Sequence, residues 1–279
     1  MRNRPSATAL RAAIRRAAHQ YWDEPTVFAD PYAVKLIAAV KNVRLSRVKP
    51  RWESPMATSL RALLAARAQF AEDVLADAVE RDVRQYCILG AGLDTFACRN
   101  PHEALGLRVF EVDHPASQAW KMDILAKARL RSAAVFAPAD FERLSLSKAL
   151  ETAGWDSGQP TLFSCLGVVS YLAGGTFTDI LRFVRQLPAG SGIVFDFPAL
   201  DRRLSLAERG LRGLVSLKLA LQGEAARSRF DPAALSGWLH DLGFKVTMLD
   251  ARDVNRRYFA ARADRLAVSW RSGLVHASV

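Results

Sequence analysis

The stretch YCILGAGLDTFACRN, residues 86–100, decides the fold of this 279-residue chain. An apolar run reaches two glycines, Gly90 and Gly92, with one residue between them, and a helix is expected just after. A loop of this kind lets the backbone approach a nucleotide phosphate closely. Asp94, however, stands where such a loop would meet its anion. The loop therefore raises the question of which ligand requires glycines and a carboxylate together.

Strand-like and helical segments alternate after residue 83. Strands are predicted at 84–90, 107–113, 132–138, 161–167, 191–197, 244–250 and 264–272. Helices are expected at 114–130, 145–153 and 176–187, and a further helix is capped by Asp231 with Pro232 in its first turn. This alternation predicts a parallel sheet with helices on both faces. It lapses at 198–230 into an Arg- and Leu-rich, helical stretch.

The chain before residue 83 is predicted to be helical. Helices are expected at 6–20 and 31–41, joined by a turn that contains two prolines. A longer helix is expected over 56–82, with apolar residues at helical spacing. Arg67 lies on the same apolar stripe, where an unpaired charge is costly. Two interpretations stay open: Arg67 snorkels at the edge of the stripe, or it binds a ligand.

The composition limits the classes of function. The chain has 39 Lys and Arg against 28 Asp and Glu, a formal net charge of +11, which raises a nucleic-acid hypothesis. The basic residues are spread out, with the densest groups at 41–51 and 202–229, and no zinc-finger or RNP pattern accompanies them. An acidic substrate or a membrane surface stays open as a partner. The three cysteines lack metal-like spacing, so no metal is expected.

The apolar runs are too short for a membrane span. Arg11, Arg15 and Arg16 interrupt the Ala-rich N-terminal stretch, which argues against a signal peptide. We therefore expect a soluble, cytoplasmic protein.

The ends of the first strands indicate a ribose-bearing ligand. Glu111 follows Gly90 by 21 residues, the spacing at which an acidic residue holds a ribose hydroxyl in dinucleotide sites. For NAD, however, Thr95 replaces the third glycine and Asp94 would face a pyrophosphate. S-adenosylmethionine carries a sulfonium and an ammonium group, which carboxylates favour, and a carboxylate, which an arginine suits. Asp94, Asp113, Asp140 and Arg67 therefore favour S-adenosylmethionine over NAD.

Longer motifs resemble a known family. YCILGAGLDTFACR, VFEVDHPASQAWK, LGVVSYL and NRRYFAARADRL are similar to motifs of the leucine carboxyl methyltransferase family, and most closely to its bacterial S-adenosylmethionine-dependent branch. The resemblance covers nearly the whole chain. It implies a class I Rossmann-like methyltransferase fold with a mostly parallel seven-stranded sheet. It also implies an N-terminal helical lid, residues 1–82, and a core, residues 83–279, with an insertion at 198–230.

The resemblance also implies roles for individual residues. Arg67 would hold the cofactor carboxylate, Gly90 would lie against the methionine part, and Asp113 would bind the ribose. Asp140 and Phe141 would flank the adenine. The cofactor-binding residues expected from the loop chemistry and the resemblance together are Arg67, Gly90, Ala91, Gly92, Asp94, Glu111, Asp113, Asp140, Phe141 and Leu166.

Two positions depart from the eukaryotic members. Leu166 stands where those enzymes have a glutamate at the end of the fourth strand, and Pro25 stands where they have a basic residue. These departures leave the fold and the cofactor unchanged but put the identity of the substrate in question. The protein-phosphatase partner of those members is therefore not expected here.

The sequence thus predicts an S-adenosylmethionine-dependent methyltransferase that methylates an oxygen, in a carboxylate or hydroxyl, of a small molecule. Tyr171 is the candidate for contact with the substrate, and no catalytic residue is assigned. The alternatives are an NAD-dependent oxidoreductase, and a basic nucleic-acid-binding protein or RNA methyltransferase.

Overall fold

The computed structural model describes residues 7–140, 145–172, 175–200, 228–269 and 272–279. Its centre is a seven-stranded sheet in the order β3-β2-β1-β4-β5-β7-β6. Six strands, β1 to β6, run in the same direction, and β7 is antiparallel to its two neighbours, β5 and β6. The strands are β1 (Gln85–Leu89), β2 (Arg108–Asp113), β3 (Val135–Pro138), β4 (Thr161–Cys165), β5 (Gly192–Pro198), β6 (Lys245–Leu249) and β7 (Ser272–Ser278).

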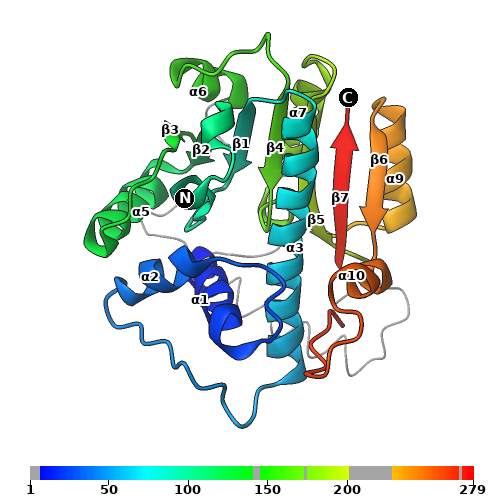
Figure 1. The fold of residues 1–279 in the computed structure, drawn as a ribbon. Coiled ribbons are helices and arrows are strands. Elements are labelled where there is room, and N and C mark those ends of the chain that lie inside the picture. Colours follow the sequence, from blue (N-terminus) through cyan, green and yellow to red (C-terminus); the bar gives the residue numbers. More distant parts are fainter. Residues whose placement is uncertain (1–6, 141–144, 173–174, 201–227, 270–271) are drawn as a thin grey trace.

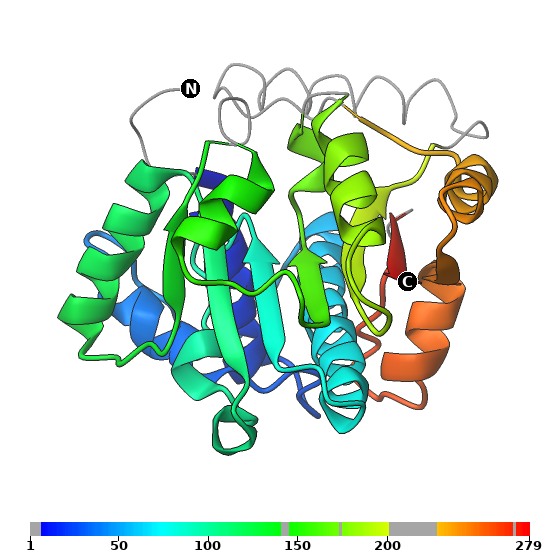
Figure 2. The ribbon, with the colours of Figure 1, turned by 90° about the horizontal axis from the view of Figure 1, so that it is seen from above.

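Helices cover both faces of the sheet, as Figure 2 shows from above. They are α1 (Ala7–Trp22), α2 (Pro31–Ala38), α3 (Pro55–Glu80), α4 (Phe96–Arg99), α5 (Pro115–Ala128), α6 (Leu146–Thr152), α7 (Thr176–Arg185), α9 (Pro232–Asp241) and α10 (Ala251–Tyr258). Short 3-10 turns lie at Glu103–Leu105 and Val169–Tyr171.

The side chains of β1 alternate between two hydrophobic core clusters, one on each face of the sheet. Cys87 and Leu89 of β1 pack in one cluster with residues of α6, α7 and α9. Tyr86 and Ile88 of the same strand pack in another cluster with residues of α3 and α10. Because successive strand side chains point to opposite faces, one apolar strand contributes to two layers of core.

The long helix α3 lies across one face of the sheet and continues past the strand ends to the first two helices (Figure 1). Ser54 caps it by accepting a hydrogen bond from the Ala57 backbone N–H, and Pro55 occupies its first turn. At 26 residues, it is about 39 Å long at 1.5 Å per residue. This length lets one helix contact both the sheet and the N-terminal helices.

Helices α1 and α2 pack against α5 and the glycine loop. Their apolar cluster includes Ala17 and Leu36 together with Leu93 of the loop and Ile124 of α5. The division of the chain into a lid of residues 1–82 and a core of residues 83–279 stays a prediction. We use "the lid" below for α1, α2 and the connections that follow them.

The structure corrects the last predicted strand. Residues 264–269 form no strand, and β7 lies later, at Ser272–Ser278. The Asn255 side chain bonds both the N–H and the carbonyl of Val268, at 2.8 and 2.9 Å, and Ser59 Oγ accepts from the N–H of Ser269 at 2.8 Å. Side chains of α10 and α3 therefore take the backbone groups that a strand would pair, while Leu266 and Val268 supply the apolar pattern by packing in the core.

Two further differences concern helices. Helix α10 was not predicted, and the helix expected after the glycines is a single turn, α4. Of the expected insertion at 198–230, residues 201–227 lie outside the described residues.

Candidate functional site

The glycine loop meets the segment after β4 at the carboxyl edge of the sheet. Gly90 and Gly92 have φ values of +66° and +48°, a conformation that glycine adopts without strain. A Cβ atom on Gly90 would lie 2.4 Å from Val168 Cγ2. From β1 the chain continues to β2 toward one edge of the sheet, and from β4 it continues to β5 toward the other edge. The switch point therefore lies between β1 and β4, and ligands of such sheets bind there. The structure therefore brings the two glycines to the expected place for a ligand.

Asp113 ends β2 beside this loop. Its carboxylate accepts hydrogen bonds of 2.6 Å from the backbone N–H groups of both Gly92 and His114. Burial raises the pKa of Asp113, and these two hydrogen bonds oppose the rise. His114 in turn caps α5, since its Nδ1 accepts from the N–H of Ala116 at 3.2 Å. Asp113 is thus held rigidly at the rim of the glycine loop.

Arg67 comes from α3 to the ends of β4 and β5. Its Nη1 lies 2.9 Å from Asp196 Oδ2, and the other Asp196 oxygen accepts from the backbone N–H of Gly167. A Cβ atom on Gly167 would lie 2.8 Å from both terminal nitrogens of the guanidinium. The side chains of Arg67 and Asp196 are 15% and 11% exposed. This largely buried ion pair places both signs of charge next to the switch point.

Neither Asp196 nor Gly167 was among the site residues expected from the sequence. The available signal was an acidic residue at the end of an otherwise apolar strand, SGIVFDF, close to the carboxyl edge. Leu166, where related enzymes are expected to carry a glutamate, lies beside Gly167 and packs against the α3 core cluster. Asp196 therefore supplies a carboxylate near the position where the fourth strand lacks one.

Asp94 connects the glycine loop to the lid. Arg16 of α1 lies 3.3 Å from Asp94 Oδ2 and donates a 2.6 Å hydrogen bond to the carbonyl of Leu93. Burial tends to raise the pKa of Asp94, but Arg16 and other neighbouring positive groups outweigh it and lower the pKa. The next residue, Thr95, donates a 2.6 Å hydrogen bond to Asp30 at the start of α2. The residues after the glycines thus hold α1 and α2 on the loop.

Glu111 lies in the interior instead of at the rim. It is 1% exposed, and Lys121 Nζ of α5 lies 2.5 Å from its Oε2. Burial raises the pKa of Glu111, and Lys121 opposes the rise. Glu111 and Lys121 are both 1% exposed, whereas Asp113 is only partly buried at the end of β2, so Asp113 is the more accessible of the two acids.

The remaining predicted residues come from the same edge. Ala91 is buried between the two glycines, and Asp140 follows β3 and is partly buried. Tyr171 ends the 3-10 turn that follows β4 and is partly buried. Phe141 lies outside the described residues. The roles of these residues toward a cofactor or substrate stay predictions.

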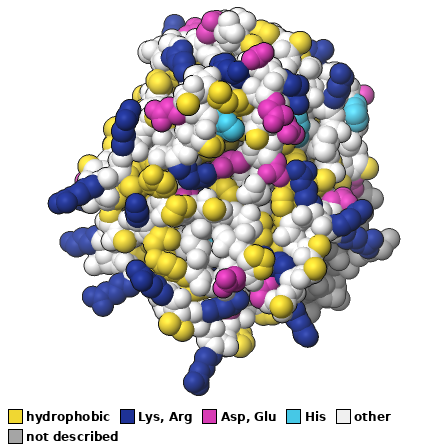
Figure 3. Space-filling view, in the orientation of Figure 1, with side chains coloured by type: hydrophobic (Ala, Val, Ile, Leu, Met, Phe, Trp, Pro, Cys, Tyr) yellow, Lys and Arg dark blue, Asp and Glu magenta, His cyan; other side chains and the backbone are white. Residues whose placement is uncertain are grey.

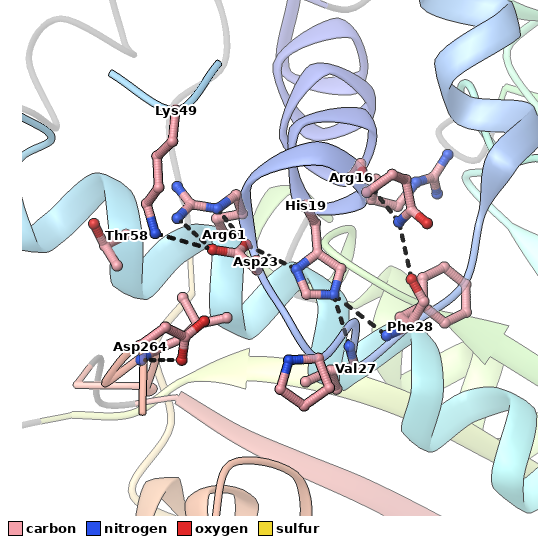
Figure 4. Close-up of polar contacts among 12 residues, drawn as sticks. Arg16, His19, Asp23, Val27, Phe28, Lys49, Thr58, Arg61 and Asp264 are labelled. Carbon is pink, nitrogen blue, oxygen red and sulfur yellow. Dashed lines mark hydrogen bonds and ion pairs between the residues drawn. The ribbon is translucent and has the colours of Figure 1, made fainter. Parts of the chain in front are cut away.

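A second group of contacts stiffens the lid (Figure 4). His19 Nε2 accepts from the backbone N–H groups of Val27 and Phe28, at 3.0 and 3.3 Å, so its proton is on Nδ1, 2.8 Å from Asp23 Oδ2. Arg61 of α3 is 1% exposed and donates to the same carboxylate at 2.6 Å. Burial tends to raise the pKa of Asp23, but His19 and Arg61 hold the pKa well below its usual value. His19 is therefore a structural residue.

The family model described as leucine carboxyl methyltransferase matches residues 9–185. The chain belongs to this family. It is 30% identical to YktD of Bacillus subtilis (strain 168), named as an S-adenosyl-L-methionine-dependent methyltransferase, with 99% of this chain and 98% of YktD covered. A similarly named protein of Mycolicibacterium smegmatis is 33% identical, over 70% of this chain and 67% of its own length.

Solved structures agree with the fold of the family. A methyltransferase structure from Thermobifida fusca has a TM-score of 0.58 at 16% identity and covers 99% of this chain and 95% of its own. A DUF574 family protein from Streptomyces avermitilis also has a TM-score of 0.58, at 18% identity, with 80% and 88% covered.

As a member of the leucine carboxyl methyltransferase family, the protein is an S-adenosylmethionine-dependent methyltransferase. The loop chemistry had favoured this cofactor over NAD, and the family assignment confirms it. None of the described helices has the length and apolar character that crossing a bilayer requires. Within the same residues, no group of three or more His, Cys, Asp or Glu side chains could hold a metal ion.

Proposed function

We propose that this methyltransferase transfers a methyl group to an oxygen, in a carboxylate or a hydroxyl, of a small molecule. The observation that carries the proposal is the seating of α1 directly on the glycine loop. Arg16 bonds the carbonyl of Leu93, and a Cβ atom on Gly92 would lie 3.0 Å from that of Ala9 in α1. A lid this close to the cofactor loop suits an acceptor small enough to be enclosed.

The residues present fit the cofactor at its amino-acid end. This end is a zwitterion, with a carboxylate and an ammonium group on one carbon. Arg67 and Asp196 offer opposite charges 2.9 Å apart, at the carboxyl edge where β4 and β5 end. Arg67 would pair with the carboxylate and Asp196 with the ammonium group, since charge-assisted hydrogen bonds are the strong ones.

The other end of the cofactor fits the glycine loop. Gly90 and Gly92 turn the chain at positive φ beside Asp113, whose carboxylate has capacity left to accept from ribose hydroxyls. When bound, the cofactor supplies an electrophilic methyl group on a sulfonium. The work of this chain is then to align the acceptor oxygen with that methyl group and to exclude water.

The segment after β4 supports an acceptor site of low polarity. Leu166 and Val168 are apolar and partly buried, and Tyr171 follows in the same segment. A carboxylate acceptor is already an anion and needs no general base, whereas a hydroxyl is helped by one. We assign Tyr171 to contact with the acceptor.

Two experiments test the proposal in order. Calorimetric titration with S-adenosylmethionine, S-adenosylhomocysteine and NAD should give binding of the first two only. Incubation of the protein with methyl-labelled cofactor and pools of small carboxylic acids, phenols and alcohols should then label a product. Mild alkali releases the label from a carboxyl ester and leaves an ether intact, which separates the two oxygen acceptors. Label found in RNA or in an N-methyl product would refute small-molecule O-methylation.

A further inference from the structure

Large apolar side chains are exposed together in the segment of residues 41–56, which joins α2 to the start of α3. Trp52 is 79% exposed, Val48 77% and Met56 42%. Six large hydrophobic side chains are exposed among the described residues, and these three fall within nine positions of the chain. The other three, Leu105, Met122 and Leu200, come from separate segments. A concentration of exposed apolar surface of this kind indicates an interaction site.

The same segment carries an excess of positive charge. Lys41, Arg44, Arg47 and Arg51 are exposed. No described carboxylate forms an ion pair with any of these four. The one acidic residue of the segment, Glu53, is already paired with the buried Arg61. Arg47 lies over the Tyr21 ring, 5.5 Å from its centroid, and none of the four cations is neutralised by a described carboxylate. They can therefore pair with an external anion.

The backbone of the segment is held in place. The Trp22 indole N–H donates a 2.9 Å hydrogen bond to the carbonyl of Ser46. The Ser46 hydroxyl bonds both the N–H and the carbonyl of Val48, at 3.1 and 3.0 Å, and Lys49 lies 3.4 Å from Asp23. The connection from α2 to α3 runs along the lower edge of the molecule in Figure 1. Lys and Arg side chains project from that lower edge in Figure 3.

We propose that the 41–56 segment docks the protein on an anionic lipid bilayer surface. Trp52 and Val48 would enter the interfacial layer, where tryptophan is favoured, and the four exposed cations would lie against the lipid phosphates. Charge complementarity and the aliphatic side chains together favour lipid over nucleic acid. Bases stack on flat aromatic rings, whereas Val48 and Met56 gain nothing from stacking but do gain from burial in lipid.

Co-sedimentation of the full chain with vesicles tests this proposal. Vesicles of phosphatidylcholine alone are compared with vesicles that also contain phosphatidylglycerol, at low and at high salt. Binding is expected only to the phosphatidylglycerol vesicles and should weaken with salt, because the cations are exposed to screening.

Matched variants separate the two contributions. Trp52→Ala should weaken binding about tenfold or more, because the indole loses its burial in lipid. The control Met122→Ala removes another exposed apolar side chain, from α5, and should change nothing. Arg44→Ser with Arg51→Ser should cost about 25-fold, at about fivefold for each cation near an anionic surface. The control Lys127→Ser with Arg131→Ser removes two positive charges outside the 41–56 segment and should cost less.

Three results would overturn the proposal. The first is no binding to phosphatidylglycerol vesicles at low salt, and the second is equal losses in test and control variants. The third is binding of polyuridylate RNA in place of vesicles, with dependence on Arg44 and Arg51 but not on Trp52, which would make the segment a nucleic-acid surface. None of these results depends on the methylation reaction.

Discussion

Arg67 Nη1 and Asp196 Oδ2 lie 2.9 Å apart, although 129 positions of sequence separate the two residues. The pair joins the middle of α3 to the end of β5, and Gly167 after β4 leaves the space that the guanidinium occupies. The proposed binding of the cofactor's amino-acid end rests on this pair, so the first two predictions concern it.

Removing the charge of Asp196 should weaken recognition of the ammonium group. Asp196→Asn keeps an acceptor for the N–H of Gly167 but loses the negative charge. We expect S-adenosylhomocysteine to bind about tenfold or more weakly by calorimetry, the usual size of a charged hydrogen bond. Binding of 5′-methylthioadenosine, which lacks the amino-acid end, should not change. Asp179→Asn, at an exposed position of α7, is the matched control. Equal losses for both ligands would show that Asp196 only supports the loop.

Removing Arg67 should weaken recognition of the cofactor's carboxylate. Arg67→Leu should weaken S-adenosylhomocysteine binding by about tenfold to a hundredfold and leave 5′-methylthioadenosine unaffected. This substitution also leaves Asp196 without its cation, which lowers stability. The double variant with Asp196→Asn removes that leftover charge, so its melting temperature should exceed that of Arg67→Leu alone. Unchanged affinity in a folded Arg67→Leu protein would refute the role of Arg67.

The glycine loop should not tolerate a side chain at its first glycine. Gly90→Ala places a Cβ atom 2.4 Å from Val168 Cγ2 at a φ of +66°. We expect a loss of about 1–3 kcal/mol of unfolding free energy, measured by urea denaturation. Gly237→Ala, inside α9 with nothing within 4 Å of the new Cβ, should be neutral or stabilising by up to about 1 kcal/mol. Adding Val168→Ala to Gly90→Ala should recover the steric part of the loss. An unaltered stability of Gly90→Ala would contradict the close approach of the two loops.

Arg16 should control the mobility of the lid. Arg16→Met removes the 2.6 Å hydrogen bond to Leu93 and the contact with Asp94. Amide hydrogen exchange in α1 should become faster, because local opening then costs less free energy. Arg15→Met is the control, since among the described residues the Arg15 side chain donates to the carbonyl of Arg11, within the same helix. If both variants exchange alike, α1 is held by its apolar packing and not by Arg16.

His276 should make the fold less stable in mild acid. Burial, followed by the nearby Arg81, lowers the pKa of His276 from 6.5 to about 4, so the imidazole stays neutral in the folded protein. The unfolded chain binds the proton more readily between these two values. Stability is therefore full above pH 6.5 and falls as the pH drops toward 4, by up to about 3 kcal/mol. His276→Asn should flatten this part of the profile of unfolding free energy against pH. His240→Asn, at an exposed position, is the control and should leave the profile unchanged.

The sequence by itself determined the layered α/β fold, the glycine loop and the cofactor class. These depend on local patterns: apolar strands that end at one edge of a sheet, and glycines at the end of the first strand. Each pattern spans only a few consecutive residues, so it can be recognised from the sequence without knowing which distant residues meet. The resemblance of its motifs to the family added the class of reaction, which the family assignment confirmed.

Only the tertiary structure decided which charged residues pair with one another around the candidate site. Asp94 and Glu111 look equivalent to Asp113 in the sequence, yet Arg16 pairs with the first and the buried Lys121 with the second. Asp196 is a candidate site residue because α3 brings Arg67 to within 2.9 Å of it. The partner of a charged side chain depends on which helices and strands pack together in the fold. The spacing of residues along a short stretch of sequence does not show this. The last strand was misplaced for a related reason, because core packing of residues 264–269 produces the same apolar pattern as a strand.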